Sequence, residues 1–192
     1  MAHDAQRAFF RTVRTRFPYY FIRVKVLDCG SLNVNGSLRE FFDDCDYLGV
    51  DVRPGPGVDH VGLVHDLPTV LPPGTRFDTI VSANMLEHDE HWDKSLRAMY
   101  KLLRPDGLLV VSAPGTRRPE HGTIYAPDSD GIAQGGNGVW GTSPEHYRAF
   151  TPADFTTVFT LKREFSAHDL QEHQDPHPDA HDVFFWGFKA LR

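Results

Sequence analysis

Two glycines and one carboxylate have the spacing expected of a binding site for a cofactor that contains a ribose. Gly30 and Gly36 lie in a turn after a short apolar run, and Asp51 ends the next such run, 21 residues after Gly30. Such a cofactor needs a close approach of the backbone at the turn and a carboxylate that accepts hydrogen bonds from the two ribose hydroxyls. The alternative is that Asp51 only turns or caps the chain, since Asp is common at strand ends.

The residues that follow Gly30 argue against a pyrophosphate in this cofactor. A nicotinamide-binding unit carries the fingerprint Gly-x-Gly-x-x-Gly, in which the later glycines help to seat the pyrophosphate. Leu32 and Asn33 occupy these positions here. We therefore expect a cofactor that has a ribose but no pyrophosphate, and NAD stays the alternative.

The elements around the turn alternate between helix and strand. Apolar residues at helical spacing predict an amphipathic helix over 4–17, within an N-terminal region of residues 1–20, and Pro18 ends it. Apolar runs predict strands over 24–28 and 47–51, with a helix over 37–42 between them. This unit has the length of a right-handed crossover between parallel strands.

The alternation continues through the second half of the chain. Trp92, Leu96, Met99 and Leu103 form one apolar helix face, which Pro105-Asp106-Gly107 ends with a turn, and Thr151 caps a later helix. Further strands are expected over 59–61, 77–83, 108–113, 164–170 and 182–190, the last two flanking a turn at 175–178 as a hairpin. The pattern predicts an α/β fold with a doubly wound sheet, which binds ligands beyond the carboxyl ends of its strands.

Polar residues at the carboxyl ends of the strands should lie together at that edge. We therefore expect one pocket to contain Asp28 to Gly36, Asp51 and Asn84 to His88. The segment 114–150 is rich in Gly, Pro and polar residues and is too long for an ordinary connection. We expect it to be a lid or a binding loop.

Length and composition favour one cytoplasmic domain. The 192 residues suffice for one substantial core, so one domain over 1–192 is expected. The sequence has no run of about 20 apolar residues and no signal-peptide pattern. Cys29 and Cys45 are expected to be reduced thiols.

The charge of the chain bears on its partners. A net charge of −6 works against long-range attraction to nucleic acid. Arg7, Arg11 and Arg14 form a stripe on the first helix, which is either a solvated face or a phosphate contact.

Several stretches from Val24 to the C-terminus, taken in order, resemble the class I S-adenosylmethionine-dependent methyltransferase family. They are Val26-Leu27-Asp28-Cys29-Gly30-Ser31, Asp51, His65-Asp66-Leu67, Phe77-Asp78-Thr79-Ile80-Val81-Ser82 with Met85-Leu86-Glu87-His88, and Leu103-Arg104-Pro105-Asp106-Gly107-Leu108-Leu109. One departure is Leu32-Asn33-Val34-Asn35, which stands where many members carry extra glycines.

The resemblance implies an enzyme with S-adenosylmethionine as cofactor and S-adenosylhomocysteine as product. It implies a Rossmann-like, seven-stranded sheet with helices on both faces and an antiparallel C-terminal strand. The first motif would hold the methionine part, Asp51 the ribose, and His65-Asp66-Leu67 the adenine. The expected cofactor-binding residues are Asp28, Gly30, Ser31, Asp51, Asp66, Leu67 and Asn84. For Asp66 the alternative is a cap before Pro68.

Methyl transfer from a sulfonium is an in-line displacement, so it depends mainly on positioning and needs a base only for some acceptors. His88 is the candidate base, and its alternative role is to order its loop by hydrogen bonding. Candidate acceptor contacts are Tyr125, His146, Tyr147 and Arg148.

Two groups of histidines and aspartates could be considered as metal ligands. Neither has an established ligand spacing, so we expect no metal. The two groups are His88, Asp89 and His91, and His173, Asp175, His177 and His181.

The acceptor itself stays open. A small molecule is the leading hypothesis, and the alternatives are an RNA, DNA or protein acceptor, or a non-catalytic cofactor-binding partner subunit. Asn84-Met85-Leu86-Glu87 lacks the two prolines that methyltransferases acting on base amino groups typically carry at this point.

Overall fold

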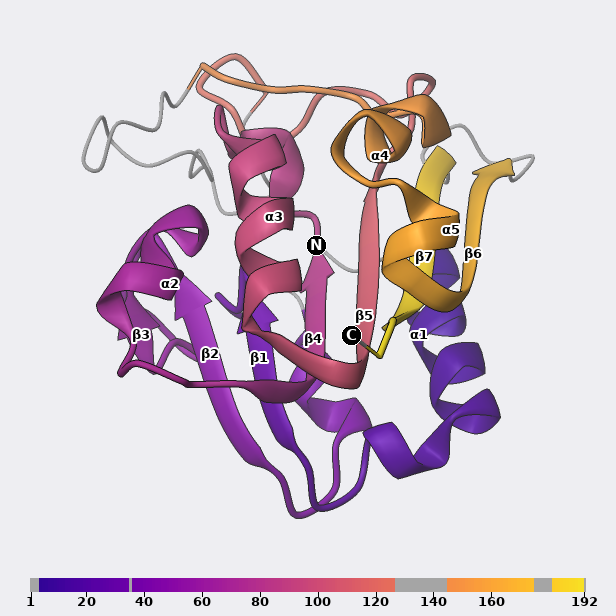
Figure 1. Ribbon diagram of the computed structural model, residues 1–192. Helices are drawn as coiled ribbons and strands as arrows, with labels where there is room; N and C mark the ends of the chain where they lie inside the picture. The colour runs from indigo at the N-terminus through magenta and orange to yellow at the C-terminus, as the bar shows by residue number, and fades with distance from the viewer. Residues whose placement is uncertain (1–3, 35, 127–144, 175–180, 192) are drawn as a thin grey trace.

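A single seven-stranded sheet organises the computed structural model, which describes residues 4–34, 36–126, 145–174 and 181–191. Its strand order is β3-β2-β1-β4-β5-β7-β6 (Figure 1). The strands are β1 (Lys25–Cys29), β2 (Asp46–Asp51), β3 (His60–Val61), β4 (Phe77–Ala83), β5 (Leu103–Pro114), β6 (Phe165–Gln174) and β7 (His181–Lys189).

Strands β1 to β5 run parallel, and β7 pairs antiparallel with both β5 and β6. This confirms the predicted terminal hairpin and the antiparallel last strand. The expected turn at 175–178 lies outside the described residues. Because parallel strands end at the same edge of a sheet, Cys29, Asp51, Ala83 and Pro114 bring their following turns together.

Alternate strand residues face two separate cores, as a period of two requires. Val26 and Val81 pack on one face with Phe10, whereas Leu27 and Ile80 pack on the other. The first face is covered by α1 (Asp4–Arg16), and the second by α2 (Leu67–Val70), α3 (Trp92–Leu102), α4 (Pro152–Val158) and α5 (Leu161–Glu164). In Figure 1, α3, α4 and α5 lie in front of the sheet. Helices on both faces confirm the predicted Rossmann-like fold.

Aromatic packing attaches α1 to the C-terminal strand. The Phe9 ring stacks on Phe184 of β7, with ring centroids 4.4 Å apart, and Phe10 is fully buried beside it. Phe17 follows the helix and packs against Trp186, and Pro18 then begins the short helix η1 (Pro18–Tyr20). The N-terminus and the last strand therefore share one core.

The structure differs from the prediction in its shortest elements. The helix expected over 37–42 is a single 3₁₀ turn, η2 (Leu38–Phe41), because Phe42 already adopts an extended conformation and ends it. The turn expected at Pro105-Asp106-Gly107 is an irregularity inside β5, where Asp106 adopts a left-handed φ of 58°. The one-turn helices α2, α5, η3 (Val64–Asp66) and η4 (Leu86–His88) were not predicted.

The two ends of the predicted loop 114–150 meet at the sheet edge. Gly115 and Phe150 form an isolated parallel bridge, and the part over 127–144 lies outside the described residues. No helix in the described ranges has the length and apolar character needed to cross a membrane. All strands within the described residues belong to one sheet, and the expected single domain over 1–192 stays a prediction.

The buried contact between α1 and the sheet gives a stability prediction. Phe10→Ala should lower the free energy of unfolding by about 3–5 kcal/mol, since it leaves a cavity under α1. Tyr19→Ala is the control, because Tyr19 is 88% exposed and its loss should cost less than about 0.5 kcal/mol. Urea unfolding measures both, and equal midpoints would contradict this packing.

Candidate functional site

The turn after β1 depends on the missing side chain of Gly30. Gly30 has a φ of +88°, and a Cβ at this position would lie 2.5 Å from the Met85 Cβ. The backbone N–H groups of Gly30 and Ser31 both donate to the Val50 carbonyl, at 2.8 and 3.1 Å. The turn is therefore fixed to the end of β2 and packed directly against the turn that follows β4.

Asp51 ends β2 beside this turn. Its Oδ2 accepts a hydrogen bond from the Leu32 N–H at 3.2 Å, and its Oδ1 accepts one from the Arg53 N–H at 3.1 Å. Burial raises the pKa of Asp51, although these backbone hydrogen bonds oppose the shift. Each carboxylate oxygen has a second acceptor position, which suits a ligand with neighbouring hydroxyls.

Asp28 is the buried acid of the site, with 2% of its surface exposed. Its Oδ2 accepts a hydrogen bond from the Tyr47 hydroxyl at 2.7 Å, while its buried Oδ1 has no hydrogen-bond partner in the described part of the chain. Burial raises the pKa of Asp28 to about 7. A cationic group placed at Oδ1 would reverse this shift.

Ser31 contributes packing to the turn. Gly49 lies against it so closely that a Cβ there would be 2.7 Å from the Ser31 Oγ and 2.2 Å from the Gly57 carbonyl oxygen. Gly57 has a φ of +88° and closes the loop after Asp51 over Ser31. Neither glycine was predicted as part of the site, although the run Arg53-Pro54-Gly55-Pro56-Gly57 signals a tight loop at Gly57.

Of the residues expected to hold the adenine, His65-Asp66-Leu67, one is exposed and another is part of the core. The Asp66 side chain is exposed, 3.9 Å from the His65 Nε2, whereas Leu67 is buried against the α3 side of the sheet. The structure shows no side-chain cap from Asp66 to α2. Cofactor binding by Asp66 and Leu67 stays a prediction.

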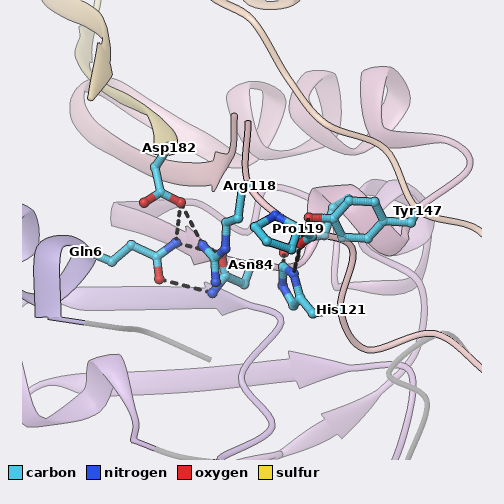
Figure 2. A network of polar contacts seen from close by, with 8 residues as sticks. Gln6, Asn84, Arg118, Pro119, His121, Tyr147 and Asp182 are labelled. Carbon is cyan, nitrogen blue, oxygen red and sulfur yellow. Dashed lines mark hydrogen bonds and ion pairs between the residues drawn. The ribbon is translucent and has the colours of Figure 1, made fainter. Parts of the chain in front are cut away.

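A buried polar network surrounds Asn84 at the end of β4 (Figure 2). The Asn84 and Gln6 carboxamides exchange hydrogen bonds of 2.6 and 3.0 Å, and Asn84 Oδ1 also accepts one from Arg118 at 3.3 Å. Arg118 pairs at 2.7 Å with Asp182, which is fully buried at the start of β7. The network ties α1, β4 and β7 to the segment after β5, and a cofactor contact by Asn84 stays a prediction.

His88 lies in a cluster that the segment after β5 completes. The His88 ring is 5.8 Å from both the His121 ring and the Tyr147 ring, measured between centroids. His121 Nε2 lies 3.5 Å from Glu87 Oε1, and Glu87 is fully buried. Burial alone would raise the pKa of Glu87, but the His121 and His88 imidazoles outweigh it and lower that pKa. Glu87 precedes His88 in the chain, but nothing in the sequence brings His121 to either of them.

The four predicted acceptor contacts separate in space. Tyr147 joins the His88 cluster, with its hydroxyl 3.2 Å from His121 Nδ1. Arg148 instead pairs with Asp154 and places its guanidinium over the Trp92 ring at 4.6 Å. The other two lie at different depths, Tyr125 exposed and His146 half-buried.

Two members of the first histidine group, Asp89 and His91, have other contacts among the described residues. Asp89 accepts hydrogen bonds from the Ser95 hydroxyl and the His91 N–H, which hold it against the start of α3. The His91 ring packs on His65 at 5.0 Å. In the terminal group, Asp175 and His177 lie outside the described residues, and His173 and His181 lie on neighbouring strands.

The chain is similar to a known protein family in sequence and to solved structures in fold. A protein-family model described as a methyltransferase domain matches residues 1–174. A search of curated proteins gives no match.

Solved structures share the fold at low identity. The 1,6-didemethyltoxoflavin-N1-methyltransferase of Burkholderia thailandensis, solved with 1,6-didemethyltoxoflavin and S-adenosylhomocysteine, is 19% identical with a TM-score of 0.64, over 98% of this chain and 79% of that one. The N-methyltransferase NodS of Bradyrhizobium japonicum is 15% identical with a TM-score of 0.57, over 97% and 88%. The T. thermophilus 16S rRNA methyltransferase RsmC is 14% identical with a TM-score of 0.56, over 98% and 44%.

Two alanine substitutions test the contact at Gly30. Gly30 and Gly74 both have a left-handed φ, of +88° and +83°, but a Cβ at Gly74 meets no atom within 4 Å. Gly74→Ala should cost about 1–2 kcal/mol of stability from backbone strain alone. Gly30→Ala should cost a further 1–3 kcal/mol or so, because it also displaces Met85. Equal losses in chemical unfolding would refute the close contact.

The buried acid predicts a pH-dependent difference between wild type and Asp28→Asn. Because the pKa of Asp28 is raised in the fold from 3.8 to about 7, unfolding releases its proton between these values. The wild type should therefore lose stability relative to the variant from about pH 4 to pH 7, with no further change above. Thermal unfolding across this range measures the difference, and a constant difference would contradict the raised pKa.

Proposed function

We propose, because the chain belongs to the methyltransferase domain family, that it transfers the methyl group of S-adenosylmethionine to a small polar acceptor beside His88. One observation carries this proposal. The Gly30 turn packs against Met85, and Met85 begins the same turn that carries Glu87 and His88. The cofactor side and the acceptor side of the site are thus in direct contact.

The residues present fit S-adenosylmethionine. Asp51 offers acceptors for its ribose hydroxyls, the buried Oδ1 of Asp28 suits its ammonium group, and Gly30 provides an approach without a side chain. The bound cofactor supplies a methyl group on a sulfonium, and the product is S-adenosylhomocysteine. Binding by Ser31, Asp66, Leu67 and Asn84 remains part of the proposal.

The chain contributes mainly position and a dry environment. Glu87 and His88 are buried, so a nucleophile held beside them is shielded from competing water. When the acceptor is a hydroxyl or a protonated amine, the His88 imidazole is placed to take its proton. Tyr147 lies against the same ring and lines the acceptor side.

Charge supports a small acceptor over a nucleic acid. Arg7 pairs with Glu40 and Arg14 pairs with Asp43, so two arginines of the stripe on α1 are neutralised. The toxoflavin-precursor enzyme was solved with a small heterocycle, whereas RsmC acts on ribosomal RNA, so the fold serves both classes. An RNA, DNA or protein acceptor stays the alternative, as does a non-catalytic subunit. A cytoplasmic location also stays a prediction.

Two aspartates on β2 form a matched pair for testing the cofactor half. Asp51→Ala should weaken S-adenosylhomocysteine binding by about tenfold or more, because hydrogen bonds to a charged group are lost. Asp46→Ala, at the opposite end of β2 and exposed, should leave binding unchanged. Calorimetry measures both, and equal affinities would remove Asp51 from the site.

Turnover tests the acceptor half. Purified protein with S-adenosylmethionine labelled in the methyl group should label a small-molecule fraction of a metabolite extract. Label appearing in RNA, DNA or protein instead would establish the alternative acceptor class. S-adenosylhomocysteine binding without product in any fraction would favour the non-catalytic subunit.

A further inference from the structure

Glu87 is a buried carboxylate whose nearest compensation is the His121 ring, 3.5 Å away. It is fully buried in η4, and neither of its side-chain oxygens accepts a hydrogen bond within the described ranges. Burying a carboxylate costs several kcal/mol unless a cation or hydrogen-bond donors offset it. The atoms around Glu87 Oε1 and Oε2 are therefore expected to include a cation.

The hydrogen bonds of His121 define which of its nitrogens faces Glu87. His121 Nδ1 lies 3.2 Å from the Pro119 carbonyl oxygen, which can only accept, so this contact places a proton on Nδ1. The other nitrogen, Nε2, lies 3.5 Å from Glu87 Oε1 and has no hydrogen-bond partner among the described residues. In the neutral ring, a lone pair on Nε2 then faces a carboxylate. A cation between these two atoms would turn their repulsion into attraction.

The surroundings of His121 match those of a metal-binding imidazole. Such rings typically donate their other N–H to a backbone carbonyl or a carboxylate, which fixes the tautomer and the ring orientation. The Pro119 carbonyl has this role, and the Tyr147 hydroxyl donates to the same oxygen at 3.2 Å. Figure 2 shows this group beside Arg118, whose ion pair with Asp182 anchors the segment to β7.

His88 supplies a third ligand. Glu87, His88 and His121 each offer one ligand atom, and these atoms all lie within 4.8 Å of one another. Neighbouring ligands of a tetrahedral zinc ion are about 3.3 Å apart, so small side-chain rotations would close the set. Two imidazoles and one carboxylate suit zinc, manganese, iron or cobalt better than magnesium or calcium, which prefer oxygen ligands.

We propose that Glu87, His88 and His121 bind one divalent transition-metal ion, which leaves a coordination position open for an oxygen of the methyl acceptor. The first half of this proposal stands on the cluster alone, and the second half rests on the proposed function. This proposal differs from the expectation of no metal, which was based on His88 with Asp89 and His91 as the possible ligands.

The ion would favour a hydroxyl acceptor. A hydroxyl coordinated to the ion would have a lowered pKa and would release its proton to solvent, so His88 would act as a ligand and not as the base. Its oxygen then bonds the methyl carbon as the carbon–sulfur bond breaks, and the sulfur leaves as the neutral thioether of S-adenosylhomocysteine. The proton, the methyl group and the bonding electrons are all accounted for without a further reactant.

Metal titration of the full chain tests the site without any cofactor. Protein freed of metal with a chelator should bind one Mn²⁺, followed by electron paramagnetic resonance, and one Zn²⁺, followed by calorimetry. Glu87→Gln, which conserves shape, and His121→Asn, which keeps a donor near Pro119, should each weaken binding by about 100-fold. His91→Ala is the matched control and should bind as the wild type does, since its ring packs on His65.

The outcomes separate the metal site from the proposed function. The metal site would be overturned if the wild type bound no metal ion, or if the wild type and His121→Asn bound it with equal affinity. In either case a shared proton, and not a metal ion, would join Glu87 and His121. Calorimetry with S-adenosylhomocysteine on metal-free protein tests the function independently, and all variants should bind it equally. Restoration of labelled turnover by Mn²⁺ or Zn²⁺ after chelation would support the role in transfer, and chelator-insensitive turnover would refute it.

Discussion

The site depends on the left-handed turn at Gly30. Only a residue without a Cβ lets β1 end against Met85, and the Val50 carbonyl then holds the turn through two backbone hydrogen bonds. Because Met85 leads directly into η4, the same contact determines where Glu87 and His88 lie relative to the cofactor side. A shift in this turn would therefore move both halves of the site together.

Two buried acids near this contact have opposite electrostatic environments. Burial dominates at Asp28, where the Tyr47 hydroxyl is the main compensation, so its pKa rises to about 7. At Glu87 the His121 and His88 rings outweigh burial, so its pKa falls and the carboxylate is ionised. One side of the edge thus suits a ligand that brings positive charge, and the other retains a negative charge among imidazoles.

The sequence predicts the fold because the fold arises from local pattern, and the same pattern indicates where a cofactor would bind, which stays a prediction. Apolar runs predict the strands, and Gly30 and Asp51 stand at the ends of two of them. On the acceptor side the sequence marks His88 and Tyr147 singly, but it could not predict that they meet His121, because this depends on contacts between distant segments. His121 lies beside Glu87 on a segment that the Arg118–Asp182 ion pair attaches to β7, and no sequence periodicity indicates that ion pair. Single-turn helices such as η4 are likewise too short to show a pattern.

A crystal structure with S-adenosylhomocysteine bound is the most direct test of how the two halves of the site meet. The ribose should contact Asp51, and the sulfur should lie on the side of the Gly30–Met85 contact that faces His88 and His121. Binding of the ligand elsewhere, or a sulfur separated from His88 by the backbone of η4, would contradict a methyl-transfer site at this edge of the sheet.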